Sequence, residues 1–171
     1  MPYNWTTPIV DRTDEDVERV KQYDLIGYKN LTESQKMEWY NDMNGMKGAL
    51  DKSDLNRIES NIGYLAEQTL ISLPIMSRWA YEDVFDLSNA NRILTNIQKL
   101  VSRFSFRVQP QIPGAPLNSY QKINQIESLL LRMYEALNRV QIEPNFLTSD
   151  DKEIQFSDDK ILCCWIPPVV D

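Results

Sequence analysis

Three stretches of this sequence are versions of one another. Residues 50–62 read LDKSDLNRIESNI, residues 85–97 read FDLSNANRILTNI, and residues 118–130 read NSYQKINQIESLL. In each copy apolar residues stand at relative positions 0, 3, 7 and 10, the spacing of a helix that packs against other helices along one seam. The seam residues are Leu55, Ile58, Ile62 and Leu65, then Ala90, Ile93, Ile97 and Leu100, then Ile123, Ile126, Leu130, Met133, Leu137 and Val140. Three such helices predict a small bundle.

Asparagine returns at one position of the repeat. Asn56, Asn91 and Asn124 stand two residues before the seam residues Ile58, Ile93 and Ile126. Because asparagine is a mediocre helix former, its return indicates a role. We expect a structural one, either a hydrogen bond to the chain that leads into the helix or a polar contact across helices. Glu59, one step round the helix from Ile58, is expected to be solvated.

Each copy opens with a short polar side chain of the type that caps a helix N-terminus. The candidates are Asp51 or Ser53, Asp86 or Ser88, and Asn118 or Ser119. The asparagines are 35 and then 33 residues apart, which is in the range of helical repeat arrays. The copies do not match over their full lengths, however, so the sequence favours a three-helix bundle with internal similarity over a regular solenoid.

The segments around the repeats predict further elements. Thr13 is expected to cap a helix that runs to about Tyr23, and Thr32 a second helix through a capping box with Gln35, with Gly45 as its stop. Breaks are expected around Pro74 and over residues 108–116, which contain three prolines and a glycine.

The C-terminal part of the chain has a different character. Residues 153–156 (EIQF) and 160–166 (KILCCWI) read as strands joined by a turn at 157–159. The predicted fold is therefore mainly α, a small helical bundle with internally similar helices plus a short C-terminal β-ribbon. We divide it into an N-terminal extension with short helices (1–48), a three-helix repeat bundle (49–142) and a strand-containing tail (143–171).

The composition argues against several classes of partner. The net charge of −7 disfavours nucleic acid and anionic membrane surfaces. No window of 18 apolar residues is present, so we expect no membrane insertion. The first twenty residues lack the basic flank and apolar core of a secretory signal, so synthesis in a cytoplasm is expected.

No motif for catalysis or cofactor binding was found. The chain has no histidine, and Cys163 and Cys164 are adjacent, so a zinc site of the usual kind lacks ligands; these cysteines read as small hydrophobes of a strand. The acidic pairs Asp150–Asp151 and Asp158–Asp159 could serve as glycosidase carboxylates, but solvated acids in turns are far commoner. The sequence therefore predicts no enzyme, no catalytic or metal-binding residue and no cofactor.

The first repeat carries a resemblance to a known group of proteins. MKGALDKSDLNRIESNIGYLAE, matching from Met46 to Leu65, resembles a module of tail- or baseplate-associated structural proteins of bacteriophages and prophages of Gram-positive bacteria. The preceding NWTTPIVDRTDEDVERV is similar to their openings, and residues 83–104 and 116–137 resemble two further helical blocks. The resemblance covers roughly residues 5–140. It departs at Asn89–Ala90, where the first copy has Asp54–Leu55, and in the third copy, which lacks the arginine.

The resemblance implies a bacteriophage virion protein, a tail or baseplate component or adaptor that acts through protein–protein contacts. Its partners would be other virion proteins and copies of itself, and it would reside in the virion after synthesis in the bacterial host. Two alternatives are a host-surface module that binds cell-wall saccharide and a cell-wall glycan hydrolase.

Aromatic residues dominate many protein interfaces. We expect Trp39 and Trp79 to belong to the core, and Trp5 and Trp165, near the termini, to contact neighbouring molecules. The apolar tail from Lys160 to Asp171, with Trp165 as its anchor, is expected to dock either on its own bundle or on a partner subunit.

Overall fold

The computed structural model describes residues 3–39, 46–80, 82–106, 108–142 and 161–163. Its elements, in chain order, are α1 (Asp14–Ile26), the 3-10 turn η1 (Tyr28–Asn30), α2 (Glu33–Trp39), α3 (Lys52–Gln68), α4 (Leu87–Val101), β1 (Phe104–Phe106), α5 (Tyr120–Ile142) and β2 (Ile161–Cys163). The prediction of a mainly helical chain built on a small bundle is confirmed. No helix among these residues is long and apolar enough to cross a membrane.

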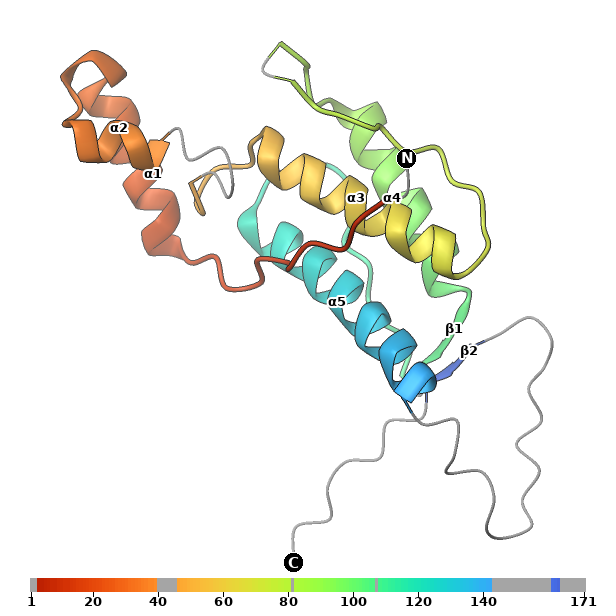
Figure 1. Ribbon diagram of the computed structural model, residues 1–171. Helices are drawn as coiled ribbons and strands as arrows, with labels where there is room; N and C mark the ends of the chain where they lie inside the picture. Colours follow the sequence, from red (N-terminus) through yellow and green to blue (C-terminus); the bar gives the residue numbers. More distant parts are fainter. Residues whose placement is uncertain (1–2, 40–45, 81, 107, 143–160, 164–171) are drawn as a thin grey trace, which may run out of the picture.

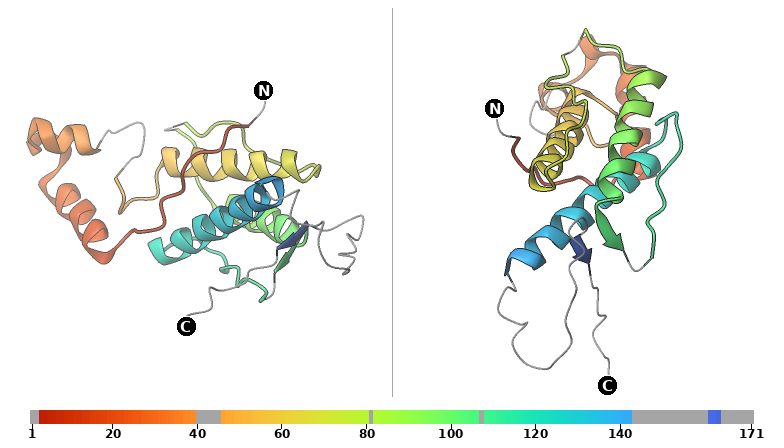
Figure 2. Two further views of the ribbon diagram at one scale, coloured as in Figure 1. Left: turned by 60° about the horizontal axis from the view of Figure 1, so that its bottom comes forward. Right: turned by 90° about the vertical axis from the view of Figure 1, so that its right-hand side faces the viewer.

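Helices α3, α4 and α5 form the bundle and contact one another pairwise. They run in the same general direction, so the chain returns along the outside of the bundle between one helix and the next (Figures 1 and 2). The seam residues of all three repeats are buried, apart from Val140, whose side chain is outside the described part. Trp79 is buried with them, as predicted, whereas Trp39 is only partly buried, against the small core of the N-terminal helices.

The predicted caps are present at the start of each repeat helix. The carboxylate of Asp51 accepts hydrogen bonds from the N–H groups of Ser53 and Asp54, and that of Asp86 from Asn89. At α5 the hydroxyl of Ser119 accepts from the N–H of Lys122 at 3.4 Å. Each cap satisfies N–H groups that have no partner inside the helix.

The N-terminal helices form a hairpin that projects from the bundle (Figure 1). Thr13 and Asp16 make the capping box of α1, which runs to Ile26, about one turn beyond the predicted end, and stops at Gly27 with φ 75°. The predicted capping box at Thr32 is also present, since Thr32 and Gln35 exchange hydrogen bonds. The predicted stop at Gly45 lies outside the described residues.

A small core of its own holds this hairpin together. Tyr23, Leu31 and Met46 are buried in it, and Glu38 of α2 accepts hydrogen bonds from Arg19 and from the Tyr23 hydroxyl of α1. After the hairpin the chain passes directly against the first turn of α1. A Cβ atom at Gly48 would stand 2.1 Å from the carbonyl oxygen of Asp16, so only glycine fits there.

The C-terminal strand β2 pairs with a strand of its own chain, β1. β2 is parallel to β1, with Phe104, Ser105 and Phe106 opposite Ile161, Leu162 and Cys163. The expected partner strand at 153–156 and the turn at 157–159 lie outside the described residues, as does Cys164. The strand identified by its β-forming residues is thus present at 161–163, but it joins a segment that follows α4.

The expectation that Glu59 is solvated is wrong. Its side chain is 2% exposed and pairs with Arg92 of α4, with a distance of 2.5 Å between Glu59 Oε1 and Arg92 Nη2. The reason is that α3 is covered on almost all sides, by α4, by α5 and by the returning chain segments. A single apolar seam therefore underestimates how much of α3 is buried.

The three equivalent seam isoleucines should make similar contributions to the free energy of unfolding. We expect Ile58→Ala, Ile93→Ala and Ile126→Ala each to lower the free energy of unfolding by about 2–5 kcal/mol, because each leaves a cavity in the shared core. Chemical denaturation followed by circular dichroism measures this. Gln98→Ala, on the exposed face of α4, is the control and should change stability by less than about 0.5 kcal/mol. Small and equal effects at all four positions would contradict the bundle.

Candidate functional site

The first described residues form an extended segment, residues 3–12, which we call the N-terminal strap. It lies across α3 and α5 (Figure 1, red). The ring of Tyr3 covers Gly63, where a Cβ atom would come within 2.3 Å of the ring. Trp5 stacks on Tyr134 of α5, with ring centroids 4.0 Å apart and planes 4° apart. The strap is therefore packed as part of the bundle.

Two asparagines bind the strap through its backbone. The side chain of Asn61 accepts a hydrogen bond from the N–H of Thr6 and donates one to its carbonyl, both at 2.8 Å. Asn124 makes the same pair of bonds with the N–H and carbonyl of Arg12, at 3.4 and 3.0 Å. An extended segment outside a sheet has no ladder partners, so these amides take the place of a neighbouring strand.

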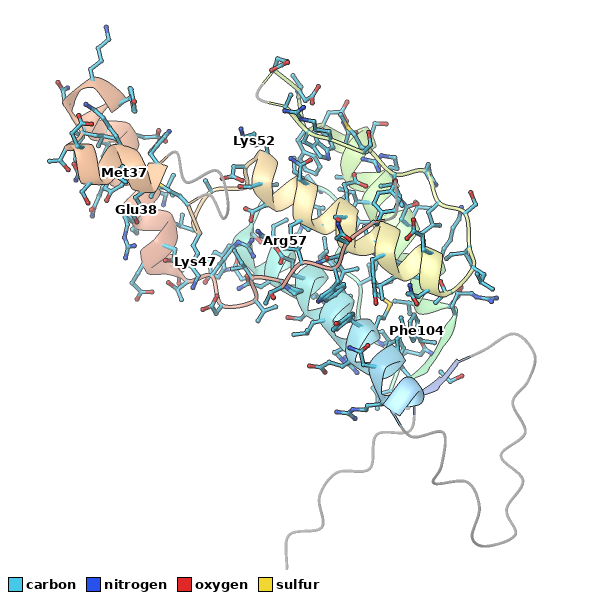
Figure 3. The ribbon with its side chains drawn as sticks, viewed as in Figure 1. Met37, Glu38, Lys47, Lys52, Arg57 and Phe104 are labelled. Carbon is cyan, nitrogen blue, oxygen red and sulfur yellow. The ribbon has the colours of Figure 1, made fainter. Side chains whose placement is uncertain are left out.

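Beneath the strap lies a cluster of four buried charges: Arg12, Asp54, Arg57 and Glu127. Each of the four side chains is at most 4% exposed. Arg12 Nη2 is 2.7 Å from Asp54 Oδ1 and 2.9 Å from Glu127 Oε1, and Arg57 bonds the same two carboxylates. Formal charges balance within the cluster, as burial requires. Figure 3 shows Arg57 between α3 and α5.

Glu127 accepts four hydrogen bonds in this cluster. Its carboxylate accepts two hydrogen bonds from Arg57, one from Arg12 and one from the backbone N–H of Ile9 at 2.5 Å. One side chain on α5 thus joins the strap, α3 and α5. Both oxygens of this buried carboxylate therefore have hydrogen-bond partners, as a buried charge requires.

The pKa values of the cluster reflect burial and pairing. Burial raises the pKa of the Asp54 carboxyl above its usual value, although the charges of Arg12 and Arg57 act to lower it. Burial acts to lower the pKa of Arg57, but the hydrogen bonds and charges of Glu127 and Asp54 outweigh it and raise that pKa overall. Burial thus outweighs pairing at Asp54, whereas pairing outweighs burial at Arg57.

The same arrangement occurs a second time around the bundle. The segment from Pro74 to Trp79, which we call the second strap, runs over α3 and α4. Asn56 pairs with both the N–H and the carbonyl of Trp79, and Glu59 accepts from the N–H of Met76 at 3.4 Å. Arg92 of the neighbouring helix binds this glutamate, as Arg57 binds Glu127.

The spacing of the strap-binding residues is the same for the two straps. The asparagine and the glutamate are three residues apart on the helix (56 and 59; 124 and 127). The residues they bind are three apart in the strap (76 and 79; 9 and 12). An internal repeat of the helices is thus accompanied by a repeat of the chain segments that they hold.

The second strap also explains an unpartnered buried atom. Asn96, which stands where Asn61 does in the first repeat, donates to the carbonyl of Pro74 at 2.8 Å. Its Oδ1 has no hydrogen-bond partner. Asn61 holds a residue with an N–H, but proline has none to donate, so only half of the amide pair can form.

A third chain segment, residues 111–116, has prolines at the positions where the second strap donates from backbone N–H groups. Gln125 donates to the carbonyl of Gln111, as Arg92 donates to that of Pro74. Counting forward from these carbonyls, Pro113 corresponds to Met76 and Pro116 to Trp79. Neither proline has an N–H, and α4 has Leu94 in the position that Glu59 has in α3. The side chain of Asn91 is exposed and forms no hydrogen bond within the described part of the chain.

The remaining predicted residues are placed as follows. Ile58, Ile93 and Ile126 meet in the core, and Asn56 and Asn124 hold straps, while Asn91 faces solvent. Trp5, expected to contact a neighbouring molecule, is half-buried and stacked within its own chain. Trp165 and the acidic pairs at 150–151 and 158–159 lie outside the described residues. Within the described ranges, no group of three acidic or cysteine side chains is arranged to hold a metal ion.

Sequence reasoning missed the charge cluster. Arg57 and Glu127 each flank a seam isoleucine, a position that a two-helix seam would leave in water. The available signal was the repetition of charged residues at these positions, together with a Pro-Ile pair in each of the two straps, at 8–9 and 74–75.

Comparison of the chain with known protein families, with curated protein sequences and with solved structures found no match in any of the three.

The two equivalent asparagines Asn124 and Asn91 provide a matched pair of mutations. We expect Asn124→Ala to lower the free energy of unfolding by about 1–3 kcal/mol, because the backbone groups of Arg12 lose their partners. Asn91→Ala should be neutral or slightly stabilising, since it removes no bond and alanine is the better helix former. Urea denaturation compares the two, and equal losses would contradict the assignment of Asn124 as a strap-binding residue.

The two carboxylates of the cluster should differ in how much they contribute to the free energy of unfolding. Glu127→Gln should cost about 3–5 kcal/mol, because two buried guanidinium groups lose a shared counter-charge. Asp54→Asn should cost less, since Asp54 accepts through one oxygen only and burial disfavours its charged form. Thermal unfolding of both variants gives the order. A larger loss for Asp54→Asn would show that the role assigned to Glu127 is wrong.

Proposed function

We propose that this chain is a structural protein of a bacteriophage virion, a tail or baseplate component or adaptor that acts by protein–protein contact. The sequence resemblance over residues 5–140 supports the phage assignment. The observation in the structure that favours a contact role is the projecting hairpin of α1 and α2, which carries large apolar side chains in water.

The exposure of these side chains is high for their size. Leu25 is 87% exposed and Met37 is 76% exposed, and Ile26 and Tyr28 are also exposed. Tyr28 lies close to α2, because the ammonium group of Lys36 stands 5.7 Å from the centre of its ring. Exposed apolar residues on a projecting element are typical of a surface that another molecule covers.

The bundle behind the hairpin is suited to a supporting role. The four charges of its buried cluster are paired with one another, and its N-terminal strap is bonded along its length to α3 and α5. A rigid base with a projecting apolar hairpin is an arrangement for joining neighbouring subunits. Partners would be other virion proteins and copies of this chain.

A direct test is to locate the protein in particles. An antibody against this chain should label the tail or baseplate of particles produced from the genome that encodes it. Labelling of no particle, with the protein present in the lysate, would contradict the proposal. Turnover of cell-wall glycan by the purified protein would instead support the hydrolase alternative.

The hairpin surface gives a mutational prediction. We expect Leu25→Asp and Met37→Asp to leave the melting temperature within a few degrees of the parent protein, because both side chains are already in water. The same changes should strongly reduce the amount of this protein in purified particles, measured by quantitative mass spectrometry. Val84→Asp, equally exposed but on the bundle side of the chain at 78%, is the control and should incorporate normally.

A further inference from the structure

A second segment of the chain repeats the sequence of the N-terminal strap. Residues 5–11 of the strap read WTTPIVD, and residues 165–171 read WIPPVVD. Tryptophan, proline, valine and aspartate stand at the same places in both segments, and the isoleucine of the strap is matched by a valine. The two segments align without a gap, so each strap residue has a counterpart 160 positions later in the chain. We call residues 165–171 the strap-like segment.

The backbone bonds of the strap show what a segment in its place must supply. Among the described residues, the strap between positions 5 and 11 donates to the helices through two backbone N–H groups. The N–H of Thr6 donates to Asn61 at 2.8 Å, and that of Ile9 donates to Glu127 at 2.5 Å. Their counterparts in the strap-like segment are Ile166 and Val169. Neither counterpart is a proline, so both N–H groups are present.

The prolines of the strap-like segment fall where the strap needs no donor. Pro167 corresponds to Thr7, which is exposed and whose N–H has no hydrogen-bond partner within the described residues. Pro168 corresponds to Pro8, which has no N–H either. A proline also favours an extended backbone in the residue before it, and the strap is extended. Both prolines are therefore compatible with the place that the strap occupies.

Two side-chain contacts of the strap have counterparts as well. Trp5 stacks on Tyr134, with ring centroids 4.0 Å apart, and Asp11 pairs with Lys47 at 2.7 Å. The strap-like segment has a tryptophan and an aspartate at the same two places, Trp165 and Asp171. It therefore carries the groups for the stacking contact, for the ion pair and for the two backbone bonds.

The strap-like segment does not reach the strap position of its own chain while β2 is paired. β2 ends opposite Phe106, whose ring centre is 5.3 Å from the guanidinium carbon of Arg132, whereas Trp5 lies on Tyr134. Residues two apart on an α-helix point about 200° apart, so the two contacts are on nearly opposite sides of α5. Figure 2 shows the strap and the two strands on different sides of this helix. Trp165 is two residues beyond β2, and two residues span at most about 7 Å, less than the roughly 10 Å diameter of a helix.

We propose that the strap-like segment of one copy of this chain binds the strap site of a second copy, in place of residues 5–11 there. The strap site is the surface of α3 and α5 that holds the strap, with Asn61, Glu127 and Tyr134. Exchange in both directions gives a closed two-fold dimer, and exchange in one direction gives an open chain of subunits. The inference rests on the strap contacts and the sequence match, and does not depend on the virion role.

The buried charge cluster stays complete in this exchange. The sequence match ends at Asp11, and the next residue, Arg12, keeps its own anchors: its backbone is bonded to Asn124, and its guanidinium group to Asp54 and Glu127. One segment leaves the strap site and an equivalent one enters, so the side chains of the site do not lose their partners. An empty strap site would instead leave buried polar groups unpaired.

The test is the oligomeric state of the full chain after refolding. The parent protein and each variant are unfolded in urea, refolded over a range of concentrations and measured by sedimentation velocity. We expect the parent to form dimers or larger species that increase with concentration. Val169→Pro should weaken this association at least tenfold, because it removes the N–H that corresponds to the one Ile9 donates to Glu127.

Val170→Pro is the matched control. It makes the same change one residue later, where the counterpart is Val10, whose N–H has no hydrogen-bond partner within the described part of the chain. This variant should associate as the parent does. A parent protein that stays monomeric at every concentration, or equal association of the two proline variants, overturns the proposal. The test uses purified protein, so its failure leaves the location of the chain in particles unaffected.

A peptide of residues 161–171 makes the test independent of how the tail variants fold. The fluorescently labelled peptide is titrated into full-length Trp5→Ala, whose own strap has lost its stacking contact, and into the double variant Trp5→Ala/Tyr134→Ala. Fluorescence anisotropy should show saturable binding to the first protein and binding at least tenfold weaker to the second. Unlabelled peptide with Val170→Pro should compete, and peptide with Val169→Pro should not. Equal binding to both proteins would show that the strap site is not where the segment binds.

Discussion

The hydrogen bonds and ion pairs of the Glu127 carboxylate are the interactions on which most of this structure depends. It lies on α5, binds Arg57 of α3, and holds both the backbone of Ile9 and the side chain of Arg12 in the N-terminal strap. Three parts of the chain that are far apart in sequence therefore meet at one buried group. Because an ionised group without partners is very costly in the interior, the strap and the helices must come together as a unit.

A buried charge cluster is by itself weak evidence of added stability. Apolar side chains of similar volume can often replace such clusters without loss of stability. The bond from Ile9 to Glu127, however, forms in only one register of the strap, and the amide pairs at Asn61 and Asn124 fix the same register. We therefore attribute to the cluster the selection of one strap position among the many that an extended segment could adopt along two helices.

Much of the bundle was predictable from the sequence, because its causes are local. The seam isoleucines and the caps Asp51, Asp86 and Ser119 follow from helical spacing and from helix-terminal chemistry. The straps were not predictable in this way. Glu59 and Arg57 look like solvent-facing residues of an amphipathic helix until the segments that cover α3 are known. Likewise, Leu94, Pro113 and Pro116 are recognised as counterparts of Glu59, Met76 and Trp79 only once the contacts of the second strap are known.

The central claim is that the N-terminal strap belongs to the cooperative core, and native-state hydrogen exchange tests it most directly. If the claim holds, the amides of Thr6 and Ile9 exchange only when the whole protein unfolds, with the same free energy of opening as core amides of α3 such as that of Ile62. If these two amides exchange through a local opening of much lower free energy while α3 stays protected, the strap is an appendage and the account is wrong.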